Sequence, residues 1–190
     1  MLSSCRNPQV PANLQEKLDS IKTLEQLEQL RAQGISLEEA SPMQQFYDSL
    51  AVQALPLSYS EDYVAMLPNY QPVPQALVQL MNFEGRMNPM AIALPETISK
   101  RLMILAADEG DDRYSLWLYV LDSEYFPTDK LCLYSPKRQA QEPDDQSTME
   151  FSITSAYEIF LTTYTADHKT KQQRLFVIND AQKFVELIPQ

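Results

Sequence analysis

The fold is decided by residues 102–121, which read LMILAADEGDDRYSLWLYVL. Two apolar runs, 102–107 and 114–121, flank a short stretch of acids around Gly110. Apolar runs of this length bounded by turn residues predict β-strands, and glycine supplies the positive φ that a tight turn between them needs. We therefore expect a β-hairpin here, with its acidic turn facing water.

Similar runs on either side extend this hairpin into a sheet. Residues 90–94 and 130–134 are short and apolar, and polar segments separate them from the hairpin. This spacing predicts an antiparallel meander. In the run 114–121 both alternating sets of side chains are largely apolar. A strand of this kind belongs inside a sheet, and we expect helices to cover it on one side.

Helix signals dominate the chain before this sheet. Asn13 and Thr23 each begin a capping-box spacing that is followed by an apolar stripe, which predicts two short helices up to Gln33. Ser41, followed by a proline, predicts a third helix that ends before a further proline at position 56. Ser60 is placed to cap a fourth helix, whose apolar residues are Tyr63, Val64 and Leu67.

Prolines mark the boundary between these helices and the sheet. Residues 67–74 contain three of the 13 prolines, which predicts an irregular connection able to divide two subdomains. We expect a helix to start at Pro74 and to end near Gly85. The fold class is then α+β, with a helical N-terminal region at 1–67 and a mainly antiparallel sheet flanked by helices at 74–190, packed as one unit.

The C-terminal part of the sequence predicts both structure types. Ser155 and Glu158 fit a capping box, which predicts a helix after the polar stretch 135–148. An apolar run at 175–178 predicts a strand. Asn179 then fits the cap of a last helix, with Phe184, Val185 and Ile188 facing inward.

The charge balance limits the partners. The 190 residues include 26 acids and 15 Lys or Arg, giving a net charge of −11. This charge repels nucleic-acid phosphates and anionic lipids, so we expect a neutral or basic protein partner, no nucleic acid and no membrane. Neither 32–85 nor 139–168 contains Lys or Arg, while both contain several acids. These acidic windows predict either one electronegative surface or simply a soluble exterior.

Few residues are suited to catalysis or cofactor binding. His168, the one histidine, lies in a polar stretch typical of a solvated loop. Cys5 and Cys132 are 127 positions apart, which excludes a Cys-x-x-Cys motif, and we expect Cys132 to be buried as a small hydrophobe. We predict no enzyme activity and no cofactor. No apolar run approaches the length of about 20 residues that spans a bilayer, and no secretory signal is recognisable, so we expect a cytoplasmic protein.

The acidic turn and the aromatic residues are the candidate functional features. Crowded carboxylates can hold Mg²⁺ or Ca²⁺, but the turn lacks the alternating acids of an EF-hand, so a solvated hairpin is the favoured interpretation. A carboxylate- and Mg²⁺-dependent enzyme that uses Asp108, Asp111 and Asp112 is the less favoured alternative. Among the tyrosines, Tyr70 and Tyr125 have polar or proline neighbours, and we expect them to be exposed.

The order of motifs between positions 74 and 161 carries a family resemblance. A proline-led helix ends in LMNFEG, and a strand, the acidic hairpin, a Trp- and Tyr-bearing strand and a further strand follow, before a closing helix SAYEIFL. This order resembles the SUKH superfamily, which includes bacterial immunity proteins and fungal cell-wall regulators. The resemblance implies an α+β fold with helices flanking the sheet. It also implies neutralisation of a cognate toxin, often a nuclease, by covering its active site.

Two binding roles follow from these observations. For an immunity protein, the predicted contact residues are six acids and one aromatic anchor: Asp108, Glu109, Asp111, Asp112, Glu61, Asp62 and Tyr70. The alternative is a scaffold or regulatory subunit of a larger assembly, in which the helices at 13–33 dock as an amphipathic pair. Deleting residues 1–40 would abolish partner binding by a scaffold and spare that of an immunity protein.

Overall fold

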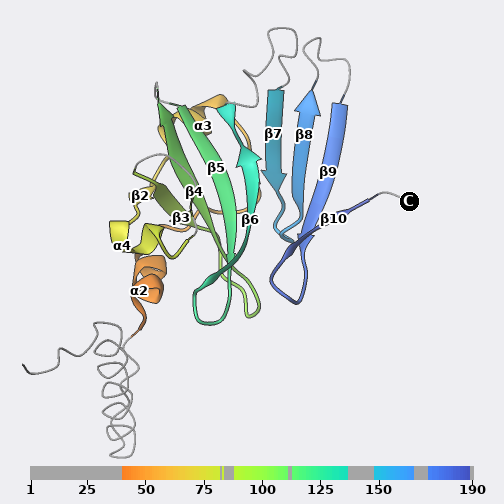
Figure 1. Cartoon of the computed structure of the whole chain (residues 1–190). Helices are drawn as coiled ribbons and strands as arrows, with labels where there is room; N and C mark the ends of the chain where they lie inside the picture. The colour runs from red at the N-terminus through yellow and green to blue at the C-terminus, as the bar shows by residue number, and fades with distance from the viewer. Residues whose placement is uncertain are drawn as a thin grey trace, which may run out of the picture. The chain divides into compact units, whose positions relative to one another are not determined.

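The computed structural model describes residues 40–81, 83, 88–110, 113–136, 148–164 and 171–188. These residues form two antiparallel five-stranded sheets, which we name sheet A and sheet B (Figure 1). Sheet A has the order β2 (Gln71–Pro72), β3 (Met90–Ala93), β4 (Arg101–Gly110), β5 (Arg113–Leu121) and β6 (Pro127–Tyr134). Sheet B has the order β1 (Leu57–Ser58), β7 (Thr148–Ile153), β8 (Ile159–Tyr164), β9 (Lys171–Ile178) and β10 (Phe184–Leu187). The described part of the chain is therefore α+β, with two sheets where one was expected.

Sheet A contains the predicted meander. Strands β3, β4, β5 and β6 follow one another along the chain, and each pairs antiparallel with the next. The expected position of β5 is confirmed, because it lies between β4 and β6. Its alternating side chains enter two different cores, which explains why both of its faces are apolar.

An inner core joins the two sheets. From β4 and β5 it takes alternate residues that are completely buried: Leu102, Ile104, Ala106, Leu116, Leu118 and Val120. From sheet B it takes Phe151, Ile153, Ile159, Leu161, Phe176 and Ile178. Full burial of a large apolar side chain contributes about 1.5–3 kcal/mol, so this core is a major source of stability.

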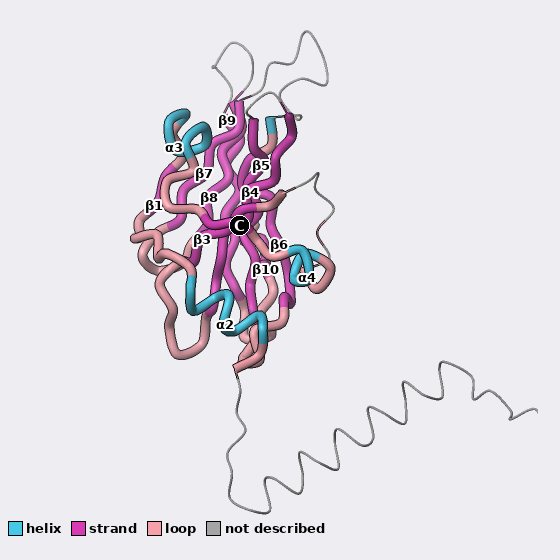
Figure 2. The backbone as a smooth tube through the Cα atoms, turned by 90° about the vertical axis from the view of Figure 1, so that its left-hand side faces the viewer, coloured by secondary structure: helices cyan, strands magenta, loops and turns pink. Residues whose placement is uncertain are grey.

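An outer core lies on the opposite face of sheet A. Helices α2 (Pro42–Ser49) and α4 (Gln75–Val78) lie against this face (Figure 2). The outer core joins the helical segments to the sheet through Met43, Phe46, Tyr47, Leu50, Leu77, Met103, Leu105, Tyr119 and Leu121. The prediction that helices cover one side of β5 is therefore confirmed, and sheet B covers its other side.

The helix caps expected at Ser41 and Ser60 are confirmed. The Ser41 hydroxyl accepts a hydrogen bond from the backbone N–H of Gln44 at 3.1 Å, and Pro42 is the first residue of α2. The Ser60 hydroxyl accepts one from the N–H of Tyr63 at 3.1 Å at the start of α3 (Glu61–Met66). Each cap satisfies a backbone donor that the helix leaves free.

The expected helix at Ser155 is wrong, because a tight turn leads into β8 instead. The Thr154 hydroxyl accepts hydrogen bonds from the N–H groups of Ala156 and Glu158, and the Thr154 N–H donates to the Glu158 carbonyl. Tyr157 has a φ of 63°, which no α-helix contains. Hydroxyl chemistry that can cap a helix closes a hairpin here. The SUKH resemblance thus loses its closing helix.

The expected helix after Asn179 is also wrong. The Asn179 carboxamide oxygen accepts a hydrogen bond from the N–H of Lys183, and the Asn179 N–H donates to the Lys183 carbonyl. Gln182 has a φ of 57°, and the chain turns back into β10, which pairs with β9. The apolar residues that suggested a helix belong instead to an edge strand.

The proline-rich segment differs in detail from its prediction. Helix α4 covers only Gln75–Val78, with Pro74 at its N-cap, and is shorter than the helix expected to reach Gly85. Residues 71 and 72 form β2 of sheet A, and the preceding α3 packs into the inner core, so this segment does not separate two cores. The helices predicted within 13–33 lie outside the described residues. In the described part of the chain, no helix is long and apolar enough to cross a membrane.

Candidate functional site

The elements that carry the described predicted acids, α3 and the turn between β4 and β5, meet at one end of the two sheets (Figure 1). Strand β4 finishes there and β5 starts there, while α3 packs beside β5. Strand β7 also begins at this end. We name as the acidic end its five described carboxylates, Glu61, Asp62, Asp108, Glu109 and Glu150. The predicted Asp111 and Asp112 lie outside the described residues.

The turn that ends β4 has the expected glycine conformation. Gly110 has a φ of 89°, and its N–H donates a hydrogen bond of 2.7 Å to the Asp108 carboxylate. Nothing lies within 4 Å of where a Cβ would stand, so glycine is needed for its backbone conformation and not for space. Asp108 and Glu109 are half-buried, and the prediction that the acids of this turn simply face water is wrong for these two.

Glu109 belongs to a hydrogen-bonded chain on the outer face of sheet A. Its carboxylate accepts a bond of 2.9 Å from the Ser115 hydroxyl, which in turn accepts one of 3.2 Å from the Trp117 indole. The Lys130 ammonium lies 5.7 Å from the centre of the Trp117 ring. Because Ser115 is only 1% exposed, this chain holds Glu109 against the sheet. The structure therefore assigns Glu109 a structural role more clearly than a role in binding a partner.

Tyrosines line the same end of the molecule. The Tyr59 ring lies 5.5 Å from that of Tyr134 and 6.2 Å from that of Phe151, centre to centre. The hydroxyls of Tyr63 and Tyr70 are 3.1 Å apart. Burial raises the pKa of Tyr70 well above its usual value. The expectation that Tyr70 is an exposed anchor is therefore wrong, because this side chain packs against the inner core.

Tyr125 also differs from its expectation of exposure. It is half-buried against the outer core, with its ring centre 5.5 Å from that of Tyr47. The Arg101 guanidinium lies 4.8 Å from the same ring centre. Tyr125 thus fixes the turn between β5 and β6 and takes no part in the acidic end.

Carboxylates from both acidic windows affect Tyr59. Burial is the main cause that raises the pKa of Tyr59, and the neighbouring Tyr134 and then Glu61 and Glu150 raise it further. Glu61 belongs to the first acidic window and Glu150 to the second, so both windows contribute negative charge near this tyrosine. The pKa of Tyr164 is also raised, first by desolvation and then by Glu150.

Tyr59 and Glu150 were not predicted to be contact residues. Tyr59 stands in a stretch rich in tyrosine, and Glu150 lies in the second acidic window. What places them together is the pairing of β1 with β7 and the bond from the Tyr59 N–H to the Phe151 carbonyl. That pairing joins segments about 90 residues apart, which local patterns do not reveal.

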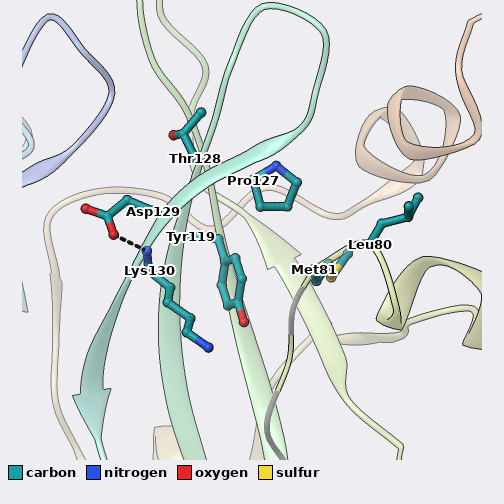
Figure 3. A pocket seen from close by; sticks show the side chains of 7 residues that line it. All are labelled: Leu80, Met81, Tyr119, Pro127, Thr128, Asp129 and Lys130. Atoms are coloured by element: carbon teal, nitrogen blue, oxygen red, sulfur yellow. Dashed lines mark hydrogen bonds between the residues drawn. The ribbon is translucent and has the colours of Figure 1, made fainter.

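A pocket of about 200 Å³ lies on the outer face of sheet A (Figure 3). Leu80, Met81 and Tyr119 line its apolar part, and the start of β6 provides Asp129 and Lys130. The Asp129 carboxylate accepts hydrogen bonds of 2.9 Å from the N–H groups of Lys130 and Phe184. This carboxylate is therefore engaged in holding β10 and β6 together.

The remaining candidates for chemistry are placed as follows. Cys132 is half-buried, not fully buried as expected, and its sulfur lies 3.7 Å from the Tyr134 carbonyl oxygen. His168 lies outside the described residues. Among the residues that are described, no three His, Cys, Asp or Glu side chains are grouped closely enough to hold a metal ion. Comparison of the chain with protein-family models, curated proteins and solved structures gave no match.

Proposed function

We propose that this protein is a non-catalytic, cytoplasmic binding protein whose acidic end receives a basic protein partner. In its most specific form the proposal is an immunity protein, which neutralises a cognate toxin by covering the toxin's active site. The observation that supports it best is the pairing of β1 with β7, which places Tyr59 beside the strand of Glu150, so that acids from both windows that lack Lys and Arg act on this tyrosine.

Carboxylates beside tyrosine rings suit a partner rich in arginine and lysine. The carboxylates accept hydrogen bonds from guanidinium or ammonium groups, and tyrosine ring faces attract the same cations. Each exposed ion pair contributes only about 0.2–1 kcal/mol. The acidic end should therefore act mainly by accelerating encounter and orienting the partner, and this effect should weaken as salt rises.

The resemblance to the SUKH superfamily supports the immunity role through the acidic hairpin and the meander, and not through the missing closing helix. A nuclease toxin is a fitting partner because proteins that bind nucleic-acid phosphates are themselves basic. Co-expression with the product of the neighbouring gene tests this form of the proposal. Protection of the cells together with a stable complex is the expected result, and the absence of both contradicts the immunity role.

Binding kinetics with the purified partner test the acidic end itself. The triple variant Glu61→Gln, Asp62→Asn, Glu150→Gln removes three charges there. The control Asp48→Asn, Glu124→Gln, Asp180→Asn removes the same charge from exposed positions elsewhere. We expect the first variant to slow association by about tenfold at low salt and the control by less than about twofold. Equal effects would show that only net charge matters and would contradict the proposal.

A further inference from the structure

The outer face of sheet B carries a group of apolar side chains that are partly or largely exposed. Its strands place there the side chains that alternate with those of the inner core, namely Phe160, Leu175, Val177, Val185 and Leu187, and Ile188 follows. Leu187 is 46% exposed and Ile188 is 82% exposed. Helices α2 and α4 lie against the outer face of sheet A, and α3 packs into the inner core (Figures 1 and 2). The outer face of sheet B therefore has no helical cover from the described part of the chain.

A groove crosses this face. It has a volume of about 280 Å³ and is lined by Phe160, Gln173, Leu175, Leu187 and Ile188. Strand register explains the groove, because Leu175 stands between Phe160 on one side and Leu187 on the other. The lining is thus a continuous apolar row across β8, β9 and β10, with room for a large apolar side chain.

Acidic residues border the groove. Glu150 lies on the same face of β7, because its neighbours Met149 and Phe151 are buried and it pairs with Thr162. Glu158 stands two residues before Phe160, in alternation with the inner-core residue Ile159. A second copy of the chain, also with a net charge of −11, would be repelled from this border, whereas a basic partner would be attracted.

Sheet A shows how the chain covers an apolar sheet face. There α2 and its C-cap present Met43, Phe46, Tyr47 and Leu50, which is the i, i+3, i+4, i+7 spacing of one helix face. An amphipathic helix with the same spacing, from outside the described residues, would fit the apolar row on the outer face of sheet B. Because acidic residues border the groove, we expect this helix to carry basic residues beside its apolar stripe.

We propose that the outer face of sheet B is a docking site for a basic amphipathic helix of a protein partner, which places a large apolar side chain in the groove of Phe160, Leu175 and Leu187. This inference rests on the proposed function for the sign of the partner's charge. It adds a second surface, adjacent to the acidic end through Glu150, and the type of segment that the surface binds.

A synthetic amphipathic peptide of leucine and lysine tests the docking site by fluorescence anisotropy. The variant Leu187→Asn, Ile188→Asn changes two exposed side chains of the face, so folding should be preserved. The matched control Val52→Asn, Ile98→Asn changes two exposed apolar side chains elsewhere, 62% and 105% exposed. We expect binding about tenfold weaker for the first variant and changed by less than about twofold for the control.

Two further peptides separate the apolar and charged contributions. A scrambled peptide of the same composition should bind about tenfold more weakly, because its leucines no longer share one helix face. A peptide with glutamate in place of lysine should not bind. Equal binding of the original and scrambled peptides, or unchanged binding to the Leu187→Asn, Ile188→Asn variant, would overturn the docking site. So would a dimer in light scattering that this variant abolishes, because the occupant would then be a second copy.

The variant Glu61→Gln, Asp62→Asn, which leaves Glu150 at the border of the groove in place, is measured with the same peptide. Loss of binding in the Leu187→Asn, Ile188→Asn variant alone supports the docking site, and the association kinetics with the protein partner then test the acidic end separately. Loss in the Glu61→Gln, Asp62→Asn variant alone overturns the docking site and leaves the proposed function intact.

Discussion

The outer face of sheet A and the outer face of sheet B are both built from antiparallel strands, yet among the described residues helices cover only the first. In sheet A the outward residues of the central strands, such as Leu105 and Tyr119, are buried under α2 and α4. In sheet B the outward residues mix apolar side chains with Thr162 and Gln173. A strand that is apolar on both faces indicates that other elements pack against both sides of its sheet. A face that mixes apolar and polar residues can stay in contact with water, and it leaves a surface available for a partner.

The largest expected difference between the two faces concerns leucine truncation. Leu105→Ala should lower the free energy of unfolding by about 2–5 kcal/mol, because it leaves a cavity in the outer core. Leu187→Ala on sheet B should change it by no more than about 0.5 kcal/mol, because the side chain is already 46% exposed. Urea denaturation of both variants measures the two values. Similar losses would mean that the face of sheet B is covered in solution.

A smaller loss of stability is expected when the N-terminal cap of α2, which covers sheet A, is removed. Ser41→Ala removes the hydroxyl that accepts the Gln44 N–H and should cost about 1 kcal/mol of unfolding free energy. The control Ser58→Ala removes an exposed hydroxyl from β1 and should cost less than about 0.5 kcal/mol. If thermal and urea unfolding give the same free energy of unfolding for both variants, the cap does not hold α2 on the sheet.

The smallest change in stability at neutral pH is expected for Tyr47, a buried residue of α2. In alkaline solution, however, Tyr47 should have a distinct effect. Burial raises its pKa from 10.0 to about 12, and the Glu96 carboxylate adds to this. Between pH 10 and about pH 12 the Tyr47 hydroxyl has lost its proton in the unfolded chain but keeps it in the folded chain. Stability should therefore fall as pH rises from 10 to 12.

Tyrosine variants assign this alkaline fall to the covered face. Tyr47→Phe should reduce the fall at little cost near neutrality, since the Tyr47 hydroxyl lies 3.4 Å from the Leu102 carbonyl oxygen, a long hydrogen bond. Tyr164→Phe, on the outer face of sheet B, should reduce it less. Urea titrations at several pH values provide the comparison, and an equal reduction in both variants would contradict the distinction between the faces.

Local signals predicted the parts of the fold that depend on local chemistry. The hairpin around Gly110 and the caps at Ser41 and Ser60 are confirmed, because turn and cap preferences act over a few residues. The helices expected at Ser155 and Asn179 are wrong for a related reason. Side-chain oxygens that cap helices also close hairpins, and only the partner strand decides between them.

The candidate site was predictable in composition and not in arrangement. The acids at 61, 62, 108 and 109 were singled out, and they do lie at one end of the sheets. Glu109 proved to be tied to Ser115, and Tyr70 to Tyr63, because the hairpin and the inner core bring these side chains together and bury them. The combined effect of Glu61 and Glu150 on Tyr59 required the pairing of β1 with β7.

The amino-acid sequence by itself determined the acidic charge, the meander of sheet A and the two capped helices, because composition and short-range periodicity carry this information. Only the tertiary structure decided that a second sheet forms the other half of the inner core, which acids are held by hydrogen bonds, and which apolar side chains of the described residues are exposed. Those outcomes depend on strand pairings between distant segments, whose free energy appears only when two surfaces are buried together.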